Sequence, residues 1–185
     1  MLTAHFAEDI CLVNRCRHAN TSLSLIKGEA NEIEFLRPDY TILQLGLVDL
    51  WPAEGRRIWP LYSEQYGRDP WVTPDEYKNN LQLFIKFANS RGSKVILVNS
   101  PPVSKPHLLK HTGLEKKIAQ YNNLLARLAP GAKGILLDWH ESVKCLAERN
   151  VFGSDGIHPT REASKLLARL LLQQIISFEE EAGNG

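Results

Sequence analysis

The sequence has no run of apolar residues that approaches the roughly 18 in succession needed by a membrane-spanning helix. Its N-terminal stretch, MLTAHFAEDICLVN, carries acidic residues where a signal peptide carries basic ones, and its apolar runs are too short for one. The net charge is only +1, which gives no electrostatic basis for binding nucleic acid or an anionic membrane. As written, the sequence therefore predicts a cytoplasmic protein with neither kind of partner.

Cysteine is scarce as well. The three cysteines, Cys11, Cys16 and Cys145, are an odd number without metal-ligand spacing, so we expect free thiols in a reducing compartment. The histidines are equally scattered, which argues against a zinc site. No glycine-rich loop follows the apolar run at residues 10–14, the first predicted strand, and this disfavours a phosphate-binding flavodoxin-like protein. We expect no metal and no cofactor.

What the sequence does contain is the alternation of strands and helices typical of an α/β protein. With 185 residues, 43% of them hydrophobic, residues 1–185 are expected to form a single domain with its own core. Four short runs are rich in Ile, Leu and Val without polar alternation, as in parallel strands covered on both faces. These predicted strands are residues 10–14, 40–46, 94–99 and 134–139.

Amphipathic helices are predicted between and after the strands. The second has a complete set of boundary signals, with Thr73 as N-cap, Pro74 at the first helical position, Glu76 as capping-box partner and Gly92 as the stop. Strands that alternate with helices imply crossover connections, a parallel sheet and a three-layer sandwich. The predicted helices cover about 21–36, 74–91, 114–128, 141–149 and, after a Thr160 cap, 161–178.

Loops at the C-terminal strand ends of such a sheet share one crevice, where ligands bind. One of these loops, GSDGIHP, places Asp155 and His158 three residues apart, with a proline directly after the histidine. A carboxylate can hold an imidazole in one tautomer and stabilise the imidazolium that forms during proton transfer. The pair is therefore a candidate acid–base pair. The structural alternative is a turn cap beside a surface histidine.

Other polar and aromatic residues follow the strand ends. Asp49 could orient the crevice or contact a substrate, and it could equally cap the next turn; Ser100 could cap the turn at its own strand end. The aromatic segment 50–72 is long for a loop, and loops of this length are usually functional or poorly ordered. The candidate pocket residues are Val48, Asp49, Trp51 and Ser100.

Taken together, the motifs resemble those of the SGNH (GDSL-type) hydrolases, a family of esterases and lipases built on a flavodoxin-like sheet. The segment DGIHPT (155–160) resembles the last conserved block of the family. The segment RPDYTILQLGLVDLWP (37–52) resembles its third block, and LVNRCRHANTS (12–22) resembles its second. The resemblance implies that His158 is a general base, that Asp155 orients it, and that the Ala19 backbone N–H helps to hold an oxyanion. The implied reaction is hydrolysis of a carboxylic ester, with O-acyl groups on a saccharide as expected substrates.

The sequence departs from the family at two functional positions. No Gly-Asp-Ser occurs, although the serine of that block is the nucleophile of the family. The third-block asparagine, a side-chain donor to the oxyanion, is replaced by Val48. Losing one such donor costs roughly a hundred- to a thousand-fold in rate, and losing the serine removes the covalent route. We therefore expect little or no esterase activity from the chain as written.

Two interpretations of the missing serine stay open. In the first, Met1 is not the natural start, and the first strand lies upstream with its serine. In the family that strand lies between the second and third, so its loss would leave a gap or force residues 10–14 to pair with 40–46. In the second, the protein is a degenerate member that binds a carbohydrate or a protein partner without cleaving it. Val48 favours this view, because truncation does not explain an internal substitution.

Cys16 is the main substitute nucleophile. It follows the first predicted strand and lies beside Arg15 and Arg17, cations that favour a reactive thiolate. The simpler alternative is a half-buried thiol at a strand end.

Overall fold

A parallel three-stranded sheet forms the centre of the computed structural model, which describes residues 10–17, 20–50, 72–130 and 135–183. The strands are β1 (Tyr40–Gln44), β2 (Lys94–Val98) and β3 (Ile135–Leu137), in that order across the sheet. Ile96 of β2 pairs with Ile42 of β1 on one side and with Ile135 of β3 on the other. Three of the predicted strands are therefore confirmed, each shorter than its apolar run.

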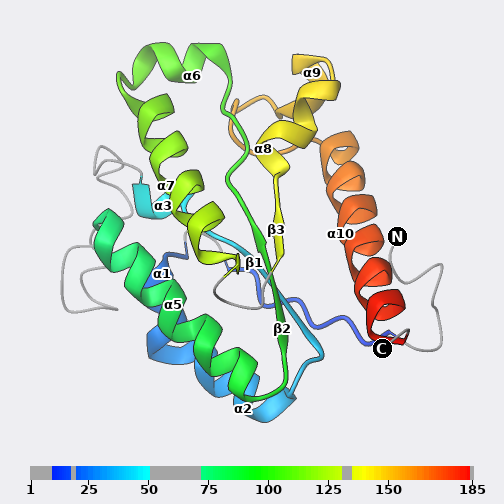
Figure 1. Cartoon of the computed structure of the whole chain (residues 1–185). Helices are drawn as coiled ribbons and strands as arrows, with labels where there is room; N and C mark the ends of the chain where they lie inside the picture. Colours follow the sequence, from blue (N-terminus) through cyan, green and yellow to red (C-terminus); the bar gives the residue numbers. More distant parts are fainter. Residues whose placement is uncertain (1–9, 18–19, 51–71, 131–134, 184–185) are drawn as a thin grey trace.

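Helices connect the strands and cover both faces of the sheet. Before β1 come α1 (Ser22–Ser24), the π-helical turn η2 (Leu25–Glu29) and α2 (Ala30–Leu36); α3 (Leu47–Leu50) and α5 (Pro74–Ser90) lie between β1 and β2. Next come α6 (Lys105–Lys110) and α7 (Leu114–Leu128), and β3 is followed by α8 (Trp139–Ser142), η4 (Val143–Cys145), α9 (Glu148–Val151) and α10 (Arg161–Gly183). In Figure 1, α5 and α7 lie on one side of the sheet and α10 on the other. The predicted three-layer, flavodoxin-like α/β sandwich is confirmed.

The central strand β2 supplies side chains to both halves of the core. Val95 and Leu97 are completely buried in the cluster that α5 and α7 also form. Ile96 and Val98 point to the opposite face, where they pack with Trp139 and with the apolar side of α10. This alternation explains why the sequence of β2 is apolar at successive positions, since both of its faces are covered.

Helix boundaries agree with the predicted ones where capping signals are present. Thr73 accepts a hydrogen bond from the Glu76 N–H at 3.2 Å, and the Glu76 carboxylate accepts one from the Thr73 N–H at 2.9 Å, which confirms the capping box. The predicted helix 141–149 is wrong as one unit, because α8, η4 and α9 replace it. Asp138 starts α8 early by accepting from the Glu141 N–H at 3.0 Å, and Leu146 is extended.

The predicted strand 10–14 is also wrong. Residues 10–17 form no ladder with any described strand, and Leu12 and Val13 are 59% and 48% exposed. Only β2 pairs with β1 among the described residues, so the apolar run does not take the place beside β1. The edge of β1 away from β2 has no partner among the described residues, so a free strand edge and an apolar run do not by themselves produce pairing.

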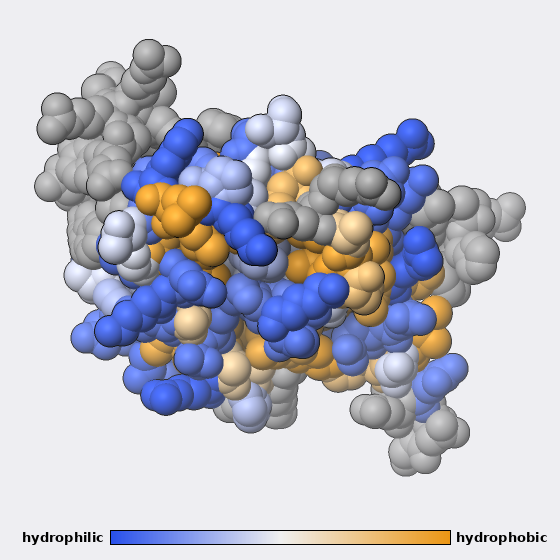
Figure 2. All heavy atoms as spheres, turned by 90° about the horizontal axis from the view of Figure 1, so that it is seen from above, coloured by the Kyte–Doolittle hydropathy of each residue, from blue (hydrophilic) through white to orange (hydrophobic). Residues whose placement is uncertain are grey.

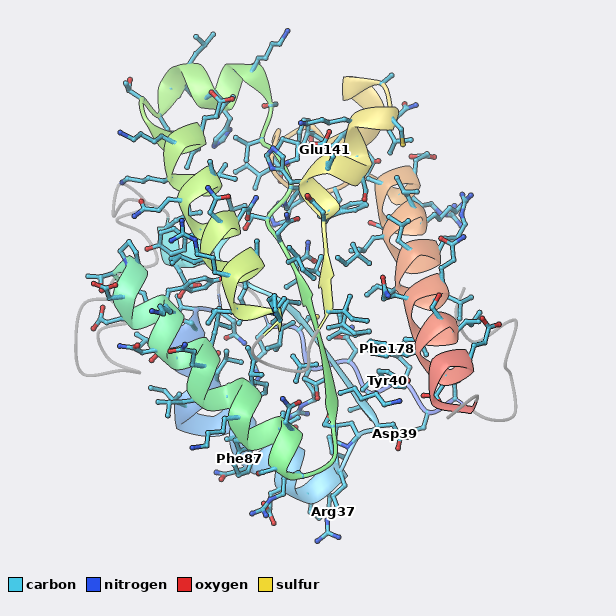
Figure 3. All side chains as sticks on the ribbon, viewed as in Figure 1. Arg37, Asp39, Tyr40, Phe87, Glu141 and Phe178 are labelled. Carbon is cyan, nitrogen blue, oxygen red and sulfur yellow. The ribbon has the colours of Figure 1, made fainter. Side chains whose placement is uncertain are left out.

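The end of α10 is fixed to the start of the sheet by a mixed aromatic and ionic cluster. Figure 3 shows Tyr40 of β1 close to Phe178 of α10, and their ring centroids are 6.3 Å apart. Lys94 Nζ donates to both the Tyr40 hydroxyl and the Glu179 carboxylate at 3.2 Å. Among the described residues no helix, α10 included, has the length and apolar character needed to cross a membrane.

Candidate active site

The loop between α9 and α10 carries Asp155 and His158 at the C-terminal end of the sheet. A backbone bridge between Phe152 and Pro159 closes the loop, and the Gly153 N–H donates to the His158 carbonyl at 2.8 Å. Thr160 then caps α10 by accepting from the Ala163 N–H at 3.2 Å. Figure 2 looks onto this end of the molecule and shows apolar side chains exposed between polar ones.

Asp155 and His158 are in direct contact. His158 Nδ1 lies 2.5 Å from Asp155 Oδ2, and the other carboxylate oxygen accepts the backbone N–H groups of Ile157 and His158, each at 3.0 Å. With Nδ1 bound to the carboxylate, Nε2 is the ring nitrogen left to exchange a proton with a substrate. The side chains of Asp155 and His158 are 48% and 69% exposed, respectively, so the pair lies at the surface of the protein.

The hydrogen bonds also set the charge of Asp155. The backbone N–H of Ile157, then the His158 ring and the His158 N–H, lower the pKa of Asp155 to about 2. Asp155 therefore stays ionised at neutral pH. An ionised carboxylate in this position can orient the His158 ring and stabilise its protonated form.

Asp49 is buried inside the protein, whereas a residue that contacts a substrate needs an accessible side chain. Its side chain is completely buried, and Oδ1 accepts from both the N–H (2.8 Å) and the hydroxyl (2.6 Å) of Ser22, at the start of α1. Asn80 of α5 donates to the same hydroxyl at 3.1 Å. Burial raises the pKa of Asp49 to about 6, against the opposing effect of the Ser22 hydrogen bonds. The carboxylate anchors α1, and it has no accessible surface from which to contact a substrate.

Ser100 is buried too, and it is held by residues that our sequence analysis did not single out. Asn122 of α7 accepts from the Ser100 N–H and donates to the Ser100 carbonyl, both at 3.0 Å. His140 Nδ1 lies 3.2 Å from the same carbonyl oxygen. One signal for Asn122 is present in the sequence, because it is a polar residue on the α7 face that carries Ile118, Tyr121 and Leu125. These contacts fix the loop after β2 rather than open a pocket at Ser100.

The other predicted site residues are scattered or lie outside the described ranges. Val48, on α3, is 38% exposed. Cys16 is an exposed free thiol, and the two arginines beside it, Arg15 and Arg17, both pair with Glu32. Figure 1 places residues 10–17 in the lower half of the molecule and the loop before α10 at the top. The two segments are therefore too far apart for the Cys16 thiol to contact the His158 imidazole. Ala19 and Trp51 are outside the described residues.

Comparisons with known proteins identify the fold. No family model matches the sequence, and no curated protein matches it either. Solved structures with the same fold include a catalytic mutant of the acetylxylan esterase Axe2 from Geobacillus stearothermophilus, with a TM-score of 0.73 and 22% identity over 94% of this chain and 76% of that one. LAE5, an α/β hydrolase from the metagenome of Lake Arreo, Spain, has a TM-score of 0.71 and 23% identity over 93% of this chain and 76% of its own.

A third likeness is more distant. The lipase/acylhydrolase from Enterococcus faecalis matches with a TM-score of 0.66 and 16% identity, over 85% of this chain and 71% of that one. The chain therefore has the fold of known esterases and acylhydrolases, and the resemblance to SGNH hydrolases is confirmed at the level of the fold.

Proposed function

We propose that residues 1–185 form one SGNH-type domain whose Asp155–His158 pair is the acid–base half of an ester hydrolase site. The observation that carries the proposal is the 2.5 Å contact between His158 Nδ1 and Asp155 Oδ2 at the ligand-binding end of the sheet. Axe2 supports it, since alanine variants at an aspartate and at a histidine three positions later are catalytic mutants of that esterase. Asp155 and His158 have the same spacing.

Acylated saccharides are the proposed substrate class, because Axe2 is an acetylxylan esterase. His158 Nε2 would take a proton from the attacking water as the bond from the water oxygen to the acyl carbon forms. The same nitrogen would then return that proton to the departing sugar oxygen as the ester bond breaks. Ala19 is proposed as a backbone donor to the oxyanion, whereas Val48 has no side-chain donor to add. Asp155 keeps its charge throughout and stabilises the imidazolium.

The attacking group is the missing part. A serine is among the positions whose alanine variants are catalytic mutants of Axe2, and no Gly-Asp-Ser occurs in this sequence. Without it, His158 can only activate water directly, and the covalent route is lost. We therefore propose that the chain as given hydrolyses esters weakly or not at all. The alternative is a module that binds an acylated saccharide or a protein partner, which Val48 favours because its apolar side chain replaces an oxyanion donor.

Hydrolysis of p-nitrophenyl acetate and of acetylated xylooligosaccharides tests the proposal. We expect the chain to release product no faster than its His158→Ala variant, with His111→Ala as a control that alters a histidine outside the pair. Clear turnover that His158→Ala abolishes would overturn the expected inactivity, and its loss in Cys16→Ala would identify a thiol nucleophile.

Two further measurements separate the weak enzyme from the binding module. Saturable calorimetric binding of acetylated xylooligosaccharides without turnover would support the binding module. The codons upstream of Met1 distinguish the same alternatives, because an in-frame apolar run that ends in Gly-Asp-Ser would supply the serine.

A further inference from the structure

The loop that carries Asp155 and His158 is attached to the loop that follows β2. The backbone N–H of Ser104, directly before α6, donates to the Gly156 carbonyl oxygen at 2.9 Å. The Ser104 side chain lies against the same residue, because a Cβ added to Gly156 would stand 2.2 Å from Ser104 Oγ and 3.1 Å from Ser104 Cβ. Ser104 therefore contacts both the carbonyl group and the α-carbon of the glycine between the two site residues.

The Gly156 carbonyl belongs to the same peptide group as the Ile157 N–H. In a trans peptide these two groups point in opposite directions, so a partner on one side fixes the direction of the group on the other. On the far side, the Ile157 N–H donates to Asp155 Oδ1 at 3.0 Å. The two hydrogen bonds thus form a chain from Ser104 through one peptide plane to the carboxylate, and hydrogen bonds in such a chain polarise and strengthen one another.

We propose that Ser104 is a positioning residue of the Asp155–His158 pair, acting through the peptide group between Gly156 and Ile157. The Ser104 N–H holds this peptide so that the Ile157 N–H points at Asp155 Oδ1, which leaves Asp155 Oδ2 for the His158 ring. The role as a positioning residue rests on the proposed function, whereas the contact itself belongs to the fold.

The pKa of Asp155 should depend on the hydrogen bond between Ser104 and Gly156. The Ile157 N–H is the largest of the causes that lower the pKa of Asp155 from its ordinary value of 3.8 to about 2. If Ser104 holds that N–H in place, removing the Ser104 N–H should allow the pKa to return toward 3.8. A residue that merely fills space at this position would not shift the titration of a carboxylate that it does not touch.

Two substitutions separate the N–H of Ser104 from its side chain. Ser104→Pro removes the donor, and the φ of −62° at Ser104 already suits a proline ring. Ser104→Ala keeps the donor and removes only the hydroxyl. In the full chain, we expect carboxyl-carbon NMR titration to show the pKa of Asp155 rising toward 3.8 in Ser104→Pro and staying at about 2 in Ser104→Ala. A downfield proton signal between His158 Nδ1 and Asp155 should weaken in the proline variant alone.

An unchanged pKa of Asp155 in Ser104→Pro would overturn the proposal, as would equal shifts in both variants. If the proline variant does not fold, the unmodified chain provides the test. The Ser104 amide shift should titrate together with Asp155, whereas the Leu108 amide, which donates to the Ser104 carbonyl at 3.1 Å, should not. A flat Ser104 titration would contradict the proposal. None of these measurements depends on ester turnover. A failure of the positioning role of Ser104 can therefore be told apart from a failure of the proposed hydrolase function.

Discussion

Replacing Gly156 with alanine is expected to disrupt the Asp155–His158 pair and to lower the free energy of unfolding by about 2–5 kcal/mol. Gly156 has a φ of +73°, a left-handed conformation that costs an alanine about 1–2 kcal/mol. The added Cβ would also stand 2.2 Å from Ser104 Oγ, so either Ser104 or the loop must move. Displacing the loop turns the Ile157 N–H away from Asp155.

Gly153→Ala is the matched control, because Gly153 lies in the same loop. The nearest atoms to its added Cβ would be the His158 carbonyl oxygen at 3.6 Å and Asp155 Oδ1 at 3.8 Å, both ordinary contacts. The control keeps the Gly153 N–H and should therefore stay within about 1 kcal/mol of the unmodified chain. Urea unfolding gives the stability, and the NMR titration of Asp155 reports the pair. Similar behaviour of the two variants would show that the left-handed glycine does not hold the loop.

The sequence predicted those parts of the fold whose signals are local. The bounds of α7 follow from amphipathic spacing, and β2 follows from an apolar run that is covered on both faces. Residues 10–14 have a similar composition, yet they are exposed and pair with no described strand, because pairing needs a register with a distant segment that no local pattern reports. A run of apolar residues therefore predicts a strand only in combination with long-range pairing, which the sequence alone does not reveal.

In the candidate site too, the local contacts could be predicted from the sequence and the long-range contacts could not. Asp155 and His158 could be predicted as a pair because they are only three positions apart in the sequence, with Gly156 between them. Ser104 could not, since its contact with Gly156 joins two loops that are far apart in the chain. Asn80 and Asn122 could be noticed in the sequence as polar residues on the otherwise apolar faces of α5 and α7. Their hydrogen-bond partners could be identified only from the structure.

Asp49 is expected to make the protein more stable at pH 4 than at pH 7. Burial raises its pKa in the folded protein to about 6, whereas the ordinary value of 3.8 applies to the unfolded chain. Between these two values the folded protein keeps a proton that the unfolded chain releases, so this stabilisation is complete below about pH 4 and is lost as the pH rises through 6. The shift of roughly two pKa units corresponds to about 3 kcal/mol.

Asp49→Asn removes this titration and keeps an oxygen that can accept from both Ser22 groups. We expect urea unfolding between pH 4 and 7 to show a flatter stability profile for Asp49→Asn than for the unmodified chain, by about 3 kcal/mol over that range. Asp49→Ala is the control: it also loses the titration, but it leaves the buried Ser22 N–H and hydroxyl without their acceptor. Its cost of about 1–3 kcal/mol should appear at every pH. If Asp49→Asn kept the original slope, another group would be the source of the pH dependence. In that case Asp49 would be ionised in the folded protein as well, held by the two hydrogen bonds that its Oδ1 accepts from Ser22.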